Sequence, residues 1–196
     1  MIKRKGEFHR KTSETDIAVS VDLDGKGTSD LTTPVPFFDH MLDLFAKHSG
    51  ADLLIQATGD VQIDDHHLVE DMGICLGGAV KTALHDRVGI NRYGSVVIPM
   101  DEVLCRATVD VSGRPYLVYH APLQETRIGQ FDASLLEEFF KAFTDHGGIT
   151  LHINVLYGKN AHHIAEAIFK AFAHAFKEAI TFNQAPGILS TKGHLD

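Results

Sequence analysis

The sequence has no long apolar run and no excess of basic residues, and these absences exclude several classes of protein. No stretch of about 18 consecutive apolar residues is present to cross a membrane. The N-terminal segment MIKRKGEFHRKTSETD is basic and then polar, without the apolar stretch of a secretory signal, so we expect a cytoplasmic protein with no membrane partner. A formal net charge of −8 leaves no basic stripe to neutralise phosphates, which argues against a nucleic-acid partner. A small anion can still bind where a few cations gather.

Cysteine is also scarce. Cys75 and Cys105 lie in apolar segments, 30 residues apart. This placement fits buried free thiols in a reducing compartment and argues against a disulfide framework or a cysteine-based metal knuckle. The balance of 44% hydrophobic and 22% charged residues is that of a globular chain. Its 196 residues suffice for one ordinary domain or two small fused ones.

Histidine is the residue type in excess, and three blocks of the chain repeat. Thirteen histidines occur among 196 residues, four of them in two adjacent pairs. FAKHSGADLLIQ (45–56) matches FTDHGGITLHIN (143–154) at an offset of 98, and HHLVE (66–70) matches HHIAE (162–166) at an offset of 96. VDLDGKG (21–27) matches VDVSGRP (109–115) at an offset of 88. We interpret the pattern as an internal duplication.

The two copies predict the same elements in the same order. IAVSVDLDG and CRATVDVSG alternate apolar and polar residues, as do ADLLIQATG and ITLHINVLYG, which is typical of half-buried strands. DHMLDLFAKHSG, SLLEEFFKAFTDHGG and the two segments that begin with His-His have helical spacing of apolar residues. We therefore predict an α+β fold of two βα halves, each a small sheet with helices on one face. The predicted divisions are 1–91 and 92–182, followed by a loop-like tail, 183–196.

Each half carries one His-His-x-x-Glu motif. In a helix, residues i and i+4 share a face, so His66 and Glu70 can bind one ion, and His162 and Glu166 can bind another. The middle histidines, His67 and His163, point about 100° away around the helix. One arrangement that uses every ligand places His163 with His66 and Glu70, and His67 with His162 and Glu166. A single such motif is weak, but two at equivalent positions favour a pair of metal sites.

The preceding helices offer a fourth ligand to each site. His40 and Glu138 correspond at the offset of 98, and both residue types bind divalent cations. Nitrogen and oxygen donors without sulfur favour manganese, iron or zinc. Among the other histidines, His48 is a site candidate because it shares a helix with His40, whereas His174 on an apolar helix is expected to be a core or interface residue.

Several longer motifs resemble those of the imidazoleglycerol-phosphate dehydratase family, in order along nearly the whole chain. They are FFDHMLDLFAKHSG, DDHHLVEDMGICLG, GINRYGS, DVSGRPYLVY, GKNAHHIAEA and STKGH. The resemblance implies a fold like ribosomal protein S5 domain 2 and a lyase of histidine biosynthesis that dehydrates imidazole glycerol phosphate to imidazole acetol phosphate. It also implies two Mn²⁺ ions per active site, active sites where subunits meet, and a homo-oligomer of 24 chains built from trimers.

The resemblance also assigns roles to residues. The implied metal ligands are His40, His66, His67, Glu70, Glu138, His162, His163 and Glu166, with Glu138 at a position that is often histidine in the family. The implied substrate contacts are Glu14, Arg92, Arg114, Ser190 and Lys192, to which we add His40 and His48. Glu14, His40 and His48 are the predicted catalytic residues, with Glu14 as the acid/base.

In the predicted chemistry, both imidazole nitrogens of the substrate bind Mn²⁺, and the ring persists as an imidazolate that expels the neighbouring hydroxyl. Two other functions fit part of the pattern. A dinuclear phosphohydrolase needs the same ligands and phosphate grips but releases inorganic phosphate. A non-enzymatic metal-binding scaffold explains the paired motifs and leaves Arg92, Arg114 and the STKG segment without a role.

Overall fold

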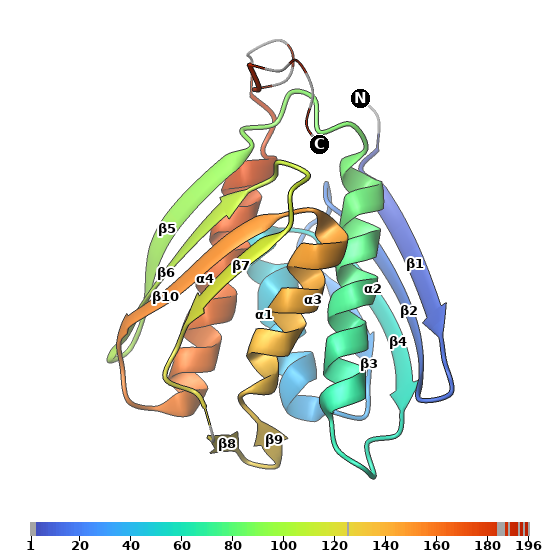
Figure 1. Ribbon diagram of the computed structural model, residues 1–196, viewed down its shortest axis with the longest axis vertical. Coiled ribbons are helices and arrows are strands. Elements are labelled where there is room, and N and C mark those ends of the chain that lie inside the picture. The colour runs from blue at the N-terminus through green and yellow to red at the C-terminus, as the bar shows by residue number, and fades with distance from the viewer. Residues whose placement is uncertain are drawn as a thin grey trace.

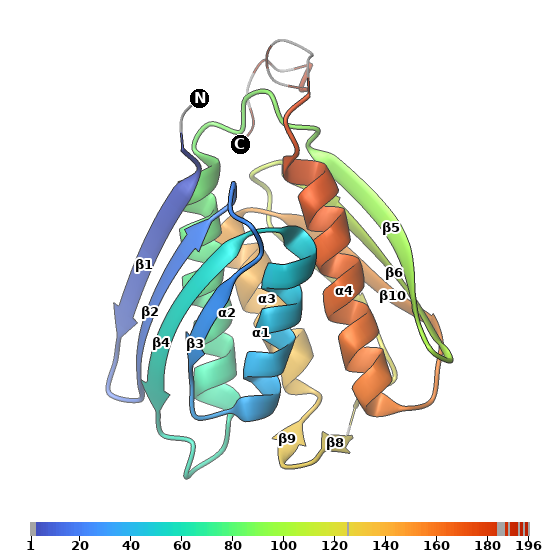
Figure 2. The same cartoon turned by 180° about the vertical axis from the view of Figure 1, so that it is seen from behind.

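In the computed structural model of the protein, two curved sheets enclose a layer of four helices (Figure 1). The described residues are 3–124, 126–183, 187, 189–191, 193 and 195. Figure 2 shows the same arrangement from behind, with the helices between the two sheets. Among the described residues, no helix is long and apolar enough to span a bilayer.

The first sheet has the strand order β1-β2-β4-β3. It contains β1 (Lys5–Lys11), β2 (Thr15–Asp22), β3 (Ser29–Thr32) and β4 (Asp52–Gly59). Alternate residues of β2, Ile17, Val19 and Val21, are buried against the helices, as the period of a strand requires. The helices of this half are α1 (Pro36–Ser49) and α2 (His66–Leu84).

The second sheet repeats the first. Its order is β5-β6-β10-β7, and in both sheets three strands are antiparallel and the fourth pairs in parallel. Its strands are β5 (Tyr93–Met100), β6 (Val103–Asp110), β7 (Tyr116–His120) and β10 (Thr150–Tyr157). The helices are α3 (Leu135–Gly147) and α4 (Ala161–Ile180), and a small hairpin, β8 (Arg127–Ile128) and β9 (Phe131–Asp132), precedes α3. The predicted fold class is confirmed.

The helices pack crosswise between the halves. α2 of the first half packs along α3 of the second, and α1 packs along α4. Gly73 lets α2 approach α3 closely, because a Cβ there would lie 2.5 Å from the carbonyl oxygen of Phe139. On the other side, the rings of Phe45 and Phe172 stack with centroids 5.2 Å apart. Each helix that carries a His-His-x-x-Glu motif therefore contacts a helix of the other half.

The predicted helices and strands are present, and α1 and α3 both end at a glycine. Gly50 ends α1 and Gly148 ends α3, each in the left-handed conformation (φ 82° and 63°). The alternating sequence pattern predicted two strands in each half. The structure adds the outer strands β1, β3, β5 and β7 and the β8–β9 hairpin. The boundaries of the two halves stay a prediction.

The closest approach of sheet and helix occurs at a repeated glycine, and substitution there tests the packing. A Cβ at Gly94 of β5 would lie 1.9 Å from the carbonyl oxygen of Ala175 in α4, and the equivalent Gly6 meets Ala79 in the same way. We expect Gly94→Ala to lower the free energy of unfolding by about 1–3 kcal/mol, because the strand must move off the helix. The measurement is chemical denaturation beside the exposed neighbour Ser95→Ala, which should change stability by less than about 0.5 kcal/mol. An unchanged stability for Gly94→Ala would contradict the close contact.

Candidate metal centre and substrate site

Both His-His pairs occupy the first turn of a helix at the same end of the molecule, the lower end in Figure 1. The α4 turn is fixed by Asn160, whose side-chain oxygen accepts hydrogen bonds from the backbone N–H groups of His162 (2.9 Å) and His163 (3.3 Å). At the start of α2, an Asp64 carboxylate oxygen accepts from the backbone N–H of His66 (2.9 Å). These hydrogen bonds hold the backbone at the first turn of each helix.

Three of the predicted metal ligands converge in one place. The Nε2 atoms of His40 and His162 each lie 3.1 Å from Oε1 of Glu166. All three ligand atoms are within 4.8 Å of one another. Ligand atoms bound about 2.1–2.2 Å from one ion lie roughly 3 Å apart when they are adjacent in an octahedron. The spacing and the nitrogen and oxygen donors therefore fit a divalent ion such as Mn²⁺.

The carboxylate of Glu166 is held in its charged form. Burial acts to raise its pKa, but hydrogen bonds from Lys170 and His40 lead the opposing effects and bring the pKa to about 2. The Lys170 ammonium donates to Oε2 at 2.6 Å, which leaves Oε1 facing the two histidines. An ionised carboxylate oxygen directed at two imidazoles is a suitable cation ligand.

The corresponding group on α2 and α3 is more open. Nε2 of His66 lies 3.9 Å from Oε2 of Glu70, and both side chains are nearly half exposed. Glu138, the counterpart of His40, lies exposed on α3. In the described part of the chain, only the group around Glu166 forms a tight set of three potential ligands.

The middle histidines turn away from both groups and toward acidic residues. Nδ1 of His163 lies 2.8 Å from Oε2 of Glu102, and this hydrogen bond raises the pKa of His163. Nδ1 of His67 lies 3.1 Å from Oδ2 of Asp60, which raises the pKa of His67. Neither middle histidine joins the three-residue group within one chain. The grouping of each middle histidine with the opposite motif stays a prediction.

Glu14, the predicted acid/base, lies on the loop between β1 and β2. Its Oε1 is 4.0 Å from Nε2 of His67, and its side chain is half exposed. The structure therefore places Glu14 beside a predicted metal ligand, at the same end of the molecule as both His-His pairs.

The predicted phosphate-binding residues lie at the opposite end. The backbone N–H of Arg92 donates to the carbonyl of Ala179 in the last turn of α4. Seventeen residues separate Ala179 from His162, which at about 1.5 Å per residue is roughly 26 Å. Asp110 holds the Arg92 guanidinium through Nε at 2.7 Å and lies 3.7 Å from Nη2 of Arg114. Ser190, another predicted substrate contact, lies in the C-terminal segment that follows α4. Lys192 lies outside the described residues.

His48 lies two turns along α1 from His40 and outside the three-residue group. Its Nδ1 is 3.1 Å from Nε2 of His174, which confirms that His174 makes a partnered contact between helices. Burial is the main cause that lowers the pKa of His48, and the neighbouring His174 adds to it. A catalytic role for His48 stays a prediction.

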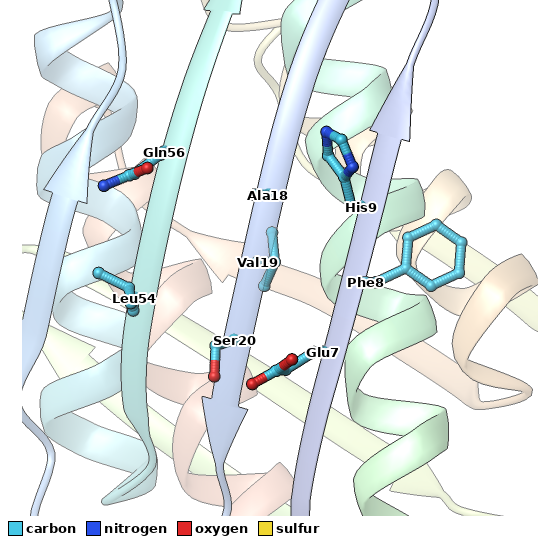
Figure 3. A pocket seen from close by; sticks show the side chains of 8 residues that line it. All are labelled: Glu7, Phe8, His9, Ala18, Val19, Ser20, Leu54 and Gln56. Atoms are coloured by element: carbon cyan, nitrogen blue, oxygen red, sulfur yellow. The ribbon is translucent and has the colours of Figure 1, made fainter.

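Two hollows at the lower end are lined by the first histidine of each motif, and a hollow elsewhere is not. One is lined by Phe37, Asp65, Gln130 and His162, and the next by Asp65, His66, Arg127 and Gln130. The pocket in Figure 3 lies instead on β1, β2 and β4, where Glu7, Ser20, Leu54 and Gln56 line it. None of the predicted site residues lines that pocket.

Four residues that form hydrogen bonds with predicted site residues were not predicted from the sequence: Asp60, Glu102, Asp110 and Lys170. A usable signal existed for Glu102, because the offset of 88 makes it the counterpart of Glu14. Lys170 follows Glu166 by four residues, which places both on one helix face. Asp60 and Asp110 had no comparable signal, since their partners become neighbours only through the tertiary fold.

The sequence matches one protein family over most of its length. The family profile described as imidazoleglycerol-phosphate dehydratase covers residues 33–176. The imidazoleglycerol-phosphate dehydratase of Syntrophus aciditrophicus is 59% identical over 100% of both chains. That of Cereibacter sphaeroides is 54% identical over 98% of this chain and 100% of its own.

Solved structures agree. The crystal structure of imidazoleglycerol-phosphate dehydratase from Staphylococcus aureus superposes with a TM-score of 0.83 at 42% identity, over 91% of this chain and 99% of its own. The enzyme from Pyrococcus furiosus gives a TM-score of 0.80 at 38% identity, over 95% of this chain and 99% of its own.

The three-residue group predicts which histidine matters for metal binding. We expect His162→Ala to weaken the binding of one Mn²⁺ ion by roughly tenfold or more, since even outer partners of metal ligands contribute that much. The matched control is His152→Ala, an exposed histidine on β10, which should bind Mn²⁺ as the parent does. Equilibrium dialysis of the metal-stripped proteins against Mn²⁺ measures both. Equal affinity of His162→Ala and the parent would exclude His162 as a ligand.

Proposed function

The chain belongs to the imidazoleglycerol-phosphate dehydratase family, and we propose that it performs this dehydration with two Mn²⁺ ions per active site. The reaction is a lyase step of histidine biosynthesis that converts imidazole glycerol phosphate to imidazole acetol phosphate. The observation that supports the metal proposal most strongly is the convergence of His40, His162 and Glu166. The other proposed ligands are His66, His67, Glu70, Glu138 and His163.

The separation of the two parts of the site supports an assembly of several copies. The histidine motifs and the arginine pair lie at opposite ends of α4, roughly 26 Å apart. A substrate the size of imidazole glycerol phosphate cannot contact both ends of one chain. We propose that the arginines of one copy complete the metal centre of another, within the 24-chain oligomer built from trimers. Closed symmetric assemblies bring different surfaces of identical chains together in this way.

Each proposed residue has a defined task. When bound, the metal ions supply Lewis acidity to the imidazole of the substrate. Glu14, half exposed beside His67, moves protons at the carbon atoms next to the ring. Arg92 and Arg114 bind the phosphate, and the Arg92 guanidinium is restrained by hydrogen bonds to Asp110 and to the carbonyl of Leu189. Ser190 and Lys192 are proposed to add a hydroxyl and a positive charge to the same phosphate.

The proposed compartment is the cytoplasm. Cys75 and Cys105 are both free and buried, and burial raises the pKa of each thiol to about 12. Such thiols are unreactive, and their reduced state is typical of a reducing compartment.

A direct assay tests the function. The metal-stripped protein is expected to form the enolisable ketone from imidazole glycerol phosphate only after Mn²⁺ is added, with no release of inorganic phosphate. The two products are measured together in each sample. Phosphate release in place of ketone would favour a dinuclear phosphohydrolase, and the absence of both products with every metal would contradict an enzymatic role.

Mixed assemblies test the shared site. We expect His162→Ala and Arg114→Ala to be inactive alone, since one lacks a metal ligand and the other a phosphate contact. When the two are co-expressed and assemble together, about a quarter of the sites should combine an intact metal end with an intact arginine end, because each site draws on two copies. The measurement is the turnover of the purified mixture relative to the parent. A mixture as inactive as its components would show that each site is built within one chain.

A further inference from the structure

The imidazole of His163 has a fixed orientation before any metal binds. Its Nδ1 atom lies 2.8 Å from Oε2 of Glu102 on the β5–β6 hairpin. An ionised carboxylate can only accept hydrogen bonds, so Nδ1 carries a proton, and in the neutral ring the lone pair belongs to Nε2, which lies 3.7 Å from Oδ2 of Asp101. The free lone pair is the one that a metal ion requires.

Glu102 is itself held in place by the start of α4. Its Oε1 atom accepts hydrogen bonds from the backbone N–H groups of Asn160 (2.8 Å) and Lys159 (3.4 Å). Asn160 in turn caps the helix at His162 and His163. The carboxylate is therefore anchored by one oxygen and directs the imidazole of His163 with the other.

His67 is oriented through the same ring atom by a residue from a different place in the fold. Both carboxylate oxygens of Asp60, directly after β4, lie 3.1–3.2 Å from Nδ1 of His67. The backbone N–H of Asp60 donates to the carbonyl of Glu14, which ties this loop to the β1–β2 hairpin. Nε2 of His67 is thereby left for a ligand, as in His163.

The duplication explains why different residues, Glu102 and Asp60, contact Nδ1 of the two middle histidines. Glu14 is the counterpart of Glu102 at the offset of 88, but it lies near Nε2 of His67, 4.0 Å away, and not at Nδ1. The segment GKNA (158–161), which precedes the second motif, has no acidic residue that could replace Asp60. In the first half, Asp60 contacts Nδ1 of His67, and Glu14 lies on the side of Nε2, where the metal ion is proposed to bind. In the second half, Glu102 contacts Nδ1 of His163.

We propose that Glu102 and Asp60 are positioning residues that fix His163 and His67 with Nε2 directed at a metal ion. The proposal rests on the proposed function, in which both histidines are metal ligands. Carboxylates that accept from the second nitrogen of a ligating histidine set its tautomer and increase its basicity, and their loss costs 10–100-fold in affinity for the metal.

The test is a Mn²⁺ titration of the full-length, metal-stripped protein, in which free Mn²⁺ is followed by its electron paramagnetic resonance signal. We expect the parent to bind two ions per chain. Glu102→Ala should weaken one of them by about 10–100-fold and leave the other unchanged, and Asp60→Ala should have the same effect on one ion. Glu102→Gln keeps one acceptor oxygen, which can replace either the contact to the backbone N–H groups or the contact to Nδ1 but not both, so its affinity for that ion should lie between those of Glu102→Ala and the parent.

The matched control is Glu178→Ala. Glu178 also accepts a hydrogen bond from a backbone N–H, that of Ser95 at 2.9 Å, but near the other end of α4. It should bind both ions as the parent does. A purely structural role for Glu102 would lower the melting temperature of the metal-free protein without a selective loss of one ion. Parent-like affinity of Glu102→Ala for both ions, or equal weakening of both, would overturn the proposal. A parent protein that binds no Mn²⁺ would instead show that the proposed metal centre is wrong.

Discussion

The crosswise packing of the helices between the two sheets is the constraint on which the site depends. α1 lies along α4 and α2 along α3, so each histidine motif faces a helix from the other half of the chain. Stacked phenylalanines hold one pair, and glycine permits the close approach of the other. His40 meets His162 and Glu166 because of this packing. The packing of α1 against α4 therefore sets the spacing of these three predicted ligands.

Glu166 and the two middle histidines among the predicted ligands each have a partner of opposite charge. Lys170 donates to one oxygen of the buried Glu166. Glu102 and Asp60 contact the Nδ1 atoms of the two middle histidines. A buried carboxylate without such a partner would protonate and lose its affinity for cations. Arg92 and Arg114, the residues proposed to bind phosphate, stand far from this cluster, and Asp110 lies beside both of them. The proposed cation-binding and anion-binding ends of the chain are thus apart, and assembly is the proposed means of joining them.

The two halves share a fold but have diverged in their chemistry. Strand order, helix order and the close glycines Gly6 and Gly94 are repeated. The residues around the motifs differ: Glu138 stands where the first half has His40, and Glu102 holds a histidine where Glu14 faces one. Repeated packing preserves the scaffold, because both sheets must cover the same helix layer. The loops and exposed helix positions are under no such requirement, so substitutions that separate two roles arise there.

The sequence alone determined the fold class, the duplication, the positions of the four helices and the family. These features depend on periodicity and on motifs whose residues are neighbours along the chain, such as the i,i+4 pair His162 and Glu166. Only the tertiary structure decided that His40 joins that pair, that Glu102 and Asp60 hold the middle histidines, and that the arginines lie at the far end of α4. These relations join residues up to 126 positions apart. They follow from the packing of whole elements, and no local pattern in the sequence encodes it.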